Sequence, residues 1–173
     1  MEPGHRKNAP AAVLVEDRRR RVDQKTGLSN QLTGRLKLYF PQILRWFSSV
    51  DSPLVWRFLE RWPDLQSAQK VSRQKLKASL ARDARSCPAA VDQFINQIRA
   101  AMLATQDRAV VNSSTVFVQG LVCELQLLRA TIQKYEKQIE SIVKQHPDFP
   151  IVSSFPGVGK ALATPDCRPR NPT

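Results

Sequence analysis

The sequence has few of the residues from which enzymes build metal sites and nucleophilic centres. Its 173 residues include two histidines and three cysteines. Cys87, Cys123 and Cys167 are scattered and odd in number, a pattern that supports neither a disulfide framework nor a zinc site and suggests a reducing compartment. His5 and His146 have no nucleophile or metal ligand near them in the sequence. We therefore expect no catalytic and no metal-binding residues.

Acidic residues are also scarce, with 15 Asp and Glu against 27 Lys and Arg. Two-metal nucleases need several carboxylates that converge at strand ends, and the chain offers no convincing strand. No apolar run approaches the length of a membrane span, and the first residues lack the apolar core of a signal peptide. We expect a cytosolic protein with no cofactor of its own and no membrane partner.

The excess of positive charge is concentrated in the first half of the chain. The formal net charge is +12, and residues 1–85 carry 18 basic and 8 acidic side chains against 9 and 7 in residues 86–173. Such a balance favours polyanions. Because no amphipathic stretch is rich in both Lys/Arg and exposed aromatics, the pattern indicates nucleic acid and not a membrane.

The longest regular pattern is an apolar seam with heptad spacing. Side chains three and four residues apart form it at Val118, Leu121, Leu125, Leu128, Ile132, Tyr135, Ile139 and Ile142. Residues 107–146 contain no proline and one glycine, which predicts a continuous helix of about 60 Å. A helix with one narrow apolar stripe needs a partner helix, from this chain or from another copy. We expect these eight residues to pair copies into a homo-oligomer, with pairing inside the chain as the open alternative.

These signals divide the chain into five parts. We expect a disordered leader over 1–10, a basic helical region over 11–106, the long coiled-coil helix over 107–146, the start of a helix-hairpin-helix domain over 147–163, and an irregular tail over 164–173. The fold class is all-α and elongated. It has a long antiparallel or intermolecular coiled coil and a partial helix-hairpin-helix at its C-terminal end.

Apolar spacing and helix-end signals predict five helices in the basic region. They cover 11–40 and 42–47, run from an N-cap at Ser52 to Pro63, follow an N-cap at Ser72, and begin at Pro88. The long helix should be capped by Thr105 or Asp107. Three tryptophans lie among aliphatic residues between positions 46 and 62, which favours a packed core over stacking on nucleobases by about three to one.

Basic side chains in two stretches could bind phosphates. Arg18, Arg19, Arg20 and Arg21 wrap around one helical turn, so at least two must face away from any packed seam. A solvated helix face is an equally good interpretation of this run. A second strip has the same ambiguity and consists of Lys70, Arg73, Lys75 and Lys77.

The strongest local motif is a glycine turn near the C-terminal end, Pro156-Gly157-Val158-Gly159-Lys160. Glycines let backbone amides approach a phosphate closely, the following helix N-terminus adds positive partial charge, and Lys160 adds a full charge. Taken alone the pattern is weak, because an ordinary tight turn has the same composition. We take Gly157, Val158, Gly159 and Lys160 as candidate DNA-binding residues.

The order of these features resembles one protein family. The motifs are LVEDRRRRVDQKTGLSNQLTGRLKLYFP at 14–41, the long helix, His-Pro at 146–147 and SFPGVG at 154–159. Over about 13–163 the chain is similar to the DEDD-type transposases of bacterial insertion sequence family 110. The ordered combination is far more specific than any single motif.

The resemblance implies a fragment of a DNA recombinase. Family members combine a ribonuclease-H-like nuclease domain with an acidic metal site that uses Mg²⁺, a helical coiled-coil region, and a helical domain that opens with the Pro-Gly-Val-Gly turn and supplies a catalytic serine. They act on DNA as oligomers, with a guide RNA in characterised members. Neither the acidic residues nor the serine matches any position of this chain, and the residues after 163 depart from the family pattern, which suggests a frameshift or truncation.

Two functions follow from the resemblance as expectations. The first is a transposase fragment that binds DNA and takes part in transposition at the family level but is catalytically inactive alone. The alternative is a non-enzymatic, nucleic-acid-binding coiled-coil protein that pairs with intact transposase or interferes with it.

Overall fold

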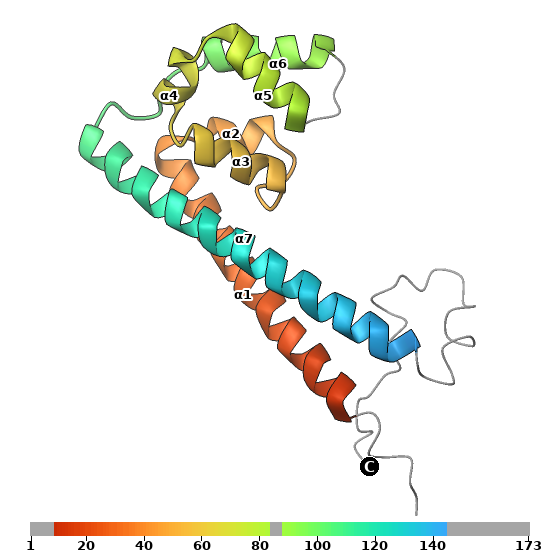
Figure 1. The fold of residues 1–173 in the computed structure, drawn as a ribbon. Helices are drawn as coiled ribbons and strands as arrows, with labels where there is room; N and C mark the ends of the chain where they lie inside the picture. The colour runs from red at the N-terminus through yellow and green to blue at the C-terminus, as the bar shows by residue number, and fades with distance from the viewer. Residues whose placement is uncertain (1–8, 84–87, 145–173) are drawn as a thin grey trace, which may run out of the picture. The chain divides into compact units, whose positions relative to one another are not determined.

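A computed structural model of the chain describes residues 9–83 and 88–144 (Figure 1). All regular secondary structure in these two ranges is α-helical, which confirms the predicted all-α class. The helices are α1 (Ala9–Tyr39), α2 (Gln42–Trp46), α3 (Pro53–Arg61), α4 (Leu65–Lys70), α5 (Arg73–Asp83), α6 (Pro88–Ala100) and α7 (Arg108–Lys144). The predicted leader, the glycine turn and the tail lie outside the described residues, apart from positions 9 and 10, which open α1.

The chain forms two compact units, and each long helix contributes to both. Unit 1 combines residues up to 25 with residues from 128 onward, and unit 2 spans residues 26–127. Unit 1 therefore contains the first half of α1 and the second half of α7. Unit 2 contains the remaining halves of these helices and all of α2 to α6.

Unit 2 has a continuous apolar core. Side chains from α1, α2 to α6 and α7 contribute to it, among them Leu36, Phe40, Trp56, Leu76, Ile95 and Leu125, all at most 1% exposed. Trp56 and Trp62 are buried and Trp46 packs against the core, so the packed-core interpretation of the tryptophans is confirmed. Trp46 meets Phe94 edge to face, with ring centroids 5.4 Å apart.

Helix starts in unit 2 follow the local capping chemistry. The Ser52 hydroxyl accepts a hydrogen bond from the Val55 amide at 3.3 Å, with Pro53 in the first turn, as predicted for α3. The carboxylate of Asp107 accepts from the amide of Ala109 at 2.8 Å, so Asp107, one of the two predicted residues, caps α7. These caps satisfy amides that have no partner inside the helix.

The predicted seam of α7 is buried within the single chain. Val118, Leu121 and Leu125 belong to the core of unit 2. In unit 1, Leu128, Ile132 and Ile139 are buried and Tyr135 and Ile142 are half-buried. The seam therefore has apolar cover without a second copy, while pairing between copies stays a prediction.

The length and composition of α7 correct one expectation. Its segment Arg108–Ile142 has a mean hydropathy of 1.3 over its most apolar window, and it is long and apolar enough to cross a membrane by these criteria alone. The expectation that no run approaches such a length is wrong for this helix. The core helix of a soluble protein passes the same test, and a third of that window is buried inside the chain.

Candidate nucleic-acid interface

The arginine run lies on α1 in unit 1, and its four members have different surroundings. Arg18 donates from Nη2 to Oε1 of Glu136 on α7 at 2.6 Å, and from Nε to the same oxygen at 3.2 Å. This ion pair fixes the direction in which Arg18 points. Because successive residues of an α-helix are about 100° apart, Arg19 and Arg20 point away from the side that carries this pair.

The other three arginines are exposed. Arg20 lies 3.5 Å from Glu16 one turn earlier, and Arg21 donates to the side chain of Gln24 at 3.1 Å. Arg19 has no hydrogen-bond or ion-pair partner among the described residues. Exposed ion pairs of this kind contribute about 0–1 kcal/mol, so a phosphate can replace Glu16 at Arg20 at little cost.

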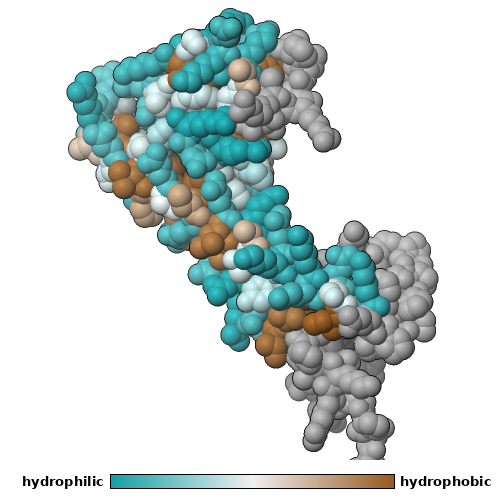
Figure 2. Space-filling view, in the orientation of Figure 1, coloured by the Kyte–Doolittle hydropathy of each residue, from teal (hydrophilic) through white to brown (hydrophobic). Residues whose placement is uncertain are grey.

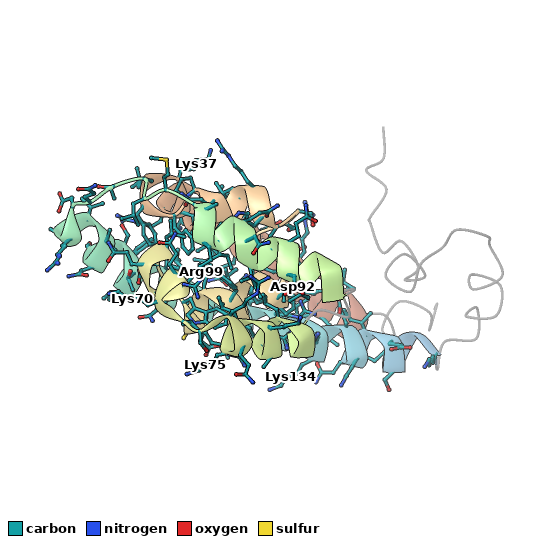
Figure 3. The ribbon with its side chains drawn as sticks, turned by 90° about the horizontal axis from the view of Figure 1, so that it is seen from above. Lys37, Lys70, Lys75, Asp92, Arg99 and Lys134 are labelled. Carbon is teal, nitrogen blue, oxygen red and sulfur yellow. The ribbon has the colours of Figure 1, made fainter. Side chains whose placement is uncertain are left out.

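A second group of basic side chains comes together in unit 2 where α4, α5 and α6 pack (Figure 3). We call it the α4–α6 basic cluster, and it consists of Arg73, Lys77 and Arg99. Lys75 lies about 160° around α5 from Arg73 and Lys77, so it points away from the cluster. Arg99 of α6 donates to the backbone carbonyl of Val71, the residue after α4. Arg73 of α5 donates to Oδ1 of Asn96 on α6 at 3.2 Å. These contacts join the basic strip of α4 and α5 to α6.

One carboxylate, that of Asp92 on α6, faces the cluster. Its Oδ2 accepts from Nζ of Lys77 at 2.9 Å, and its Oδ1 accepts from Nη2 of Arg73 at 3.3 Å. The hydrogen bond from Lys77, supported by that from Arg73, lowers the pKa of Asp92. The Asp92 carboxylate offsets one of the three positive charges of the cluster.

The start of α5 adds to the positive potential. The hydroxyl of Ser72 accepts from the amide of Lys75, so this predicted cap is present. The first turn has no acidic side chain and carries Arg73 and Lys75. A helix N-terminus has a positive partial charge and favours acidic neighbours, so basic residues here oppose helix stability and favour anions. Figure 2 shows that the visible face over α4 to α6 is largely hydrophilic.

The sequence identified Arg73 and Lys77 of this cluster but missed Arg99 and the role of Asp92. Arg99 lies 22 residues beyond Lys77, and only the packing of α6 against α5 brings it close. Helix α4 was also missed, although Asp64 and Ser67 form a capping box at its start, with Asp64 Oδ1 accepting from the Ser67 amide at 2.8 Å.

The remaining candidate residues have separate outcomes. Gly157, Val158, Gly159 and Lys160 lie outside the described residues, so their role stays a prediction. Among residues 9–83 and 88–144, no group of three or more His, Cys, Asp or Glu side chains could hold a metal ion. Cys123 is a free, exposed thiol.

Two curated proteins are similar to most of the chain. One is described as the mini-circle putative transposase for IS117 of Streptomyces coelicolor, 27% identical over 157 residues. The other is described as an uncharacterized 43.6 kDa protein of insertion element IS110 from the same organism, 28% identical over 160 residues. The matches cover 87% and 90% of this chain. They confirm the resemblance to insertion-sequence transposases that the sequence motifs indicated.

The chain spans 37% and 38% of the length of these two relatives. No family model matches it, and no solved structure is similar to it. The relationship therefore rests on a long alignment of moderate identity together with the ordered motifs.

Proposed function

We propose that this chain is the helical middle portion of an insertion-sequence transposase and that it binds DNA. The similarity over about nine-tenths of its length to proteins of two insertion elements carries this proposal. The net charge of +12 supports it, because a protein that binds DNA neutralises phosphates with Lys and Arg and releases the counterions condensed on them.

In unit 1, Arg19 and Arg20 are the proposed contacts to the DNA backbone. Both are exposed and turned away from the Arg18–Glu136 ion pair. Arg18 has a different role, because its guanidinium is held by Glu136 and links α1 to α7. Of the four arginines predicted to bind DNA, two are therefore best placed to do so. The glycine turn at 157–160 stays a proposed second contact.

The test is DNA binding by the full chain with two arginines neutralised. For duplex DNA, each phosphate contact adds about 0.9 to the steepness with which log K falls against log salt. One contact therefore raises the binding constant about eightfold at 0.1 M salt relative to 1 M salt. The double variant R19Q/R20Q should therefore bind up to about 60-fold more weakly, with a slope smaller by about 1.8.

The matched control is K134Q/K137Q, which removes the same charge from exposed positions of α7 in the same unit. It should change the affinity only severalfold and leave the slope nearly unchanged, because a basic residue that makes no phosphate contact acts only through the screened field. Equal losses in the two double variants would show that net charge, and not the arginine run, is responsible.

We also propose that the chain alone does not cut DNA strands. The support is that the resemblance assigns neither the acidic metal ligands nor the serine to any residue of this chain. The chain should leave the ends of its element intact in the presence of Mg²⁺, the metal expected for the intact enzyme. Specific nicks at an element end, detected on a denaturing gel, would contradict this part of the proposal.

A further inference from the structure

The α4–α6 basic cluster brings three cations and one carboxylate together from α5 and α6 in unit 2. Arg73 and Lys77 both donate to Asp92, and Arg73 also donates to Asn96. Arg99, about two helical turns after Asp92 on α6, donates to the carbonyl of Val71, two residues before Arg73. Figure 3 shows Asp92 and Arg99 on α6.

We propose that the α4–α6 basic cluster is a second binding site for the phosphodiester backbone of duplex DNA, which Asp92 weakens by occupying two of its cations. This inference rests on the proposed function and adds a site in unit 2 to the arginines of unit 1.

The cluster is better suited to bind phosphates than the arginine run, because fewer carboxylates lie near its basic side chains. Around Arg18 to Arg21, three carboxylates lie within five residues, at Glu16, Asp17 and Asp23. In the cluster, Asp92 is the single acidic residue with an ion pair to a member among the described residues. Arg99 and Arg73 are each oriented by a hydrogen bond between α6 and a neighbouring element, so part of the site is arranged before DNA arrives.

Asp92 competes directly with a phosphate. The Nη2 group of Arg73 and the Nζ group of Lys77 donate to its two oxygens, so these donors are partly occupied until the ion pairs open. Both pairs are exposed, with side-chain exposures of 57% for Arg73, 46% for Lys77 and 35% for Asp92, so water and salt weaken them. DNA can open them, and removing the carboxylate frees both donors in advance.

The decisive test is a rise in affinity, which partial unfolding does not produce. D92N keeps the shape of the side chain and removes its charge. Duplex DNA titrated with the full-length variant at 0.1 M salt should bind about eightfold more tightly for each additional phosphate neutralised, and the slope of log K against log salt should steepen by about 0.9 per phosphate. The matched control is E124Q, which makes the same change of net charge on α7, a helix that contributes no member to the cluster.

A loss-of-affinity pair completes the design. R73Q/K77Q should weaken binding by up to about 60-fold, because it removes both cations that donate to Asp92. The matched control is K70Q/K75Q, which removes two charges from exposed positions of α4 and α5 outside the cluster and should cost only severalfold. Circular dichroism on each variant confirms that the helices are retained.

Each outcome has one meaning. If the unmodified chain shows no salt-dependent binding to duplex DNA, both this inference and the proposed function fall. If the chain binds, R19Q/R20Q weakens it, and D92N behaves like E124Q, only the second site is overturned. If D92N tightens binding to duplex RNA of the same length and not to DNA, the assignment of DNA as the ligand is overturned.

Discussion

Truncating Leu125 tests how the long helix α7 is held. Leu125 is fully buried in the core of unit 2, whereas Leu127, two residues later on the same helix, is 69% exposed. Leu125→Ala removes three carbon atoms from the core. Their transfer from water contributes about 0.8 kcal/mol each, and the cavity left behind raises the total loss to about 3–5 kcal/mol.

The matched control is Leu127→Ala, which makes the same chemical change on the solvent side. It should alter the free energy of unfolding by at most about 0.5 kcal/mol, since surface substitutions away from special features have small effects. In urea, with a slope of about 2 kcal/mol per molar, Leu125→Ala should lower the unfolding midpoint by about 1.5–2.5 M. The signal is helical ellipticity.

The same titration separates the two ways of covering the seam. If α7 is buried within the chain, the midpoint is independent of protein concentration. If copies pair through the seam, a hundredfold rise in concentration adds about 2.7 kcal/mol to the apparent stability. Equal changes in the free energy of unfolding for Leu125→Ala and Leu127→Ala would show that the seam is not buried.

Two further predictions concern buried polar groups. Ser114 is fully buried, and its hydroxyl has no hydrogen-bond partner among the described residues. Ser114→Ala should therefore raise the free energy of unfolding by about 1 kcal/mol more than Ser113→Ala, the same change at the exposed neighbouring position. An equal or smaller rise would mean that the hydroxyl of Ser114 has a hydrogen-bond partner. The Tyr39 hydroxyl donates to the carbonyl of Pro63 at 2.7 Å, and burial raises the pKa of Tyr39 above its usual value near 10. Tyr39→Phe should cost about 1 kcal/mol at pH 7. Because the folded state holds the Tyr39 proton more tightly, the contribution of Tyr39 to stability falls above pH 10 by up to about 1.4 kcal/mol per pH unit. The deficit of Tyr39→Phe should therefore shrink by about pH 11, and a constant deficit would contradict the pKa shift.

Local chemistry explains which helices the sequence predicted. Ser52, Ser72 and Asp107 were recognised as caps because each hydrogen bond joins residues only two or three apart, and the structure has all three. Helix α4 was missed because six residues are too few to show an apolar period, although the Asp64 capping box marks its start.

The other gaps come from interactions between distant residues. Heptad spacing on α7 is the same whether the partner helix belongs to this chain or to another copy, so periodicity alone left both open. The arginine run looked uniform in the sequence, yet one ion pair from Arg18 to Glu136, 118 residues away, gives its members different surroundings. The pairing of Asp92 with Arg73 and Lys77 likewise depends on how α5 packs against α6.

Binding of this chain to DNA through its basic side chains is the property on which the proposed function depends. The most direct test is the affinity of the full chain for duplex DNA, measured by fluorescence anisotropy between about 50 and 200 mM salt. We predict that log K falls linearly with log salt, with a slope between about −2 and −6 for roughly two to seven phosphate contacts. Affinity that does not change with salt, or no binding at the lowest salt concentration, would contradict this prediction.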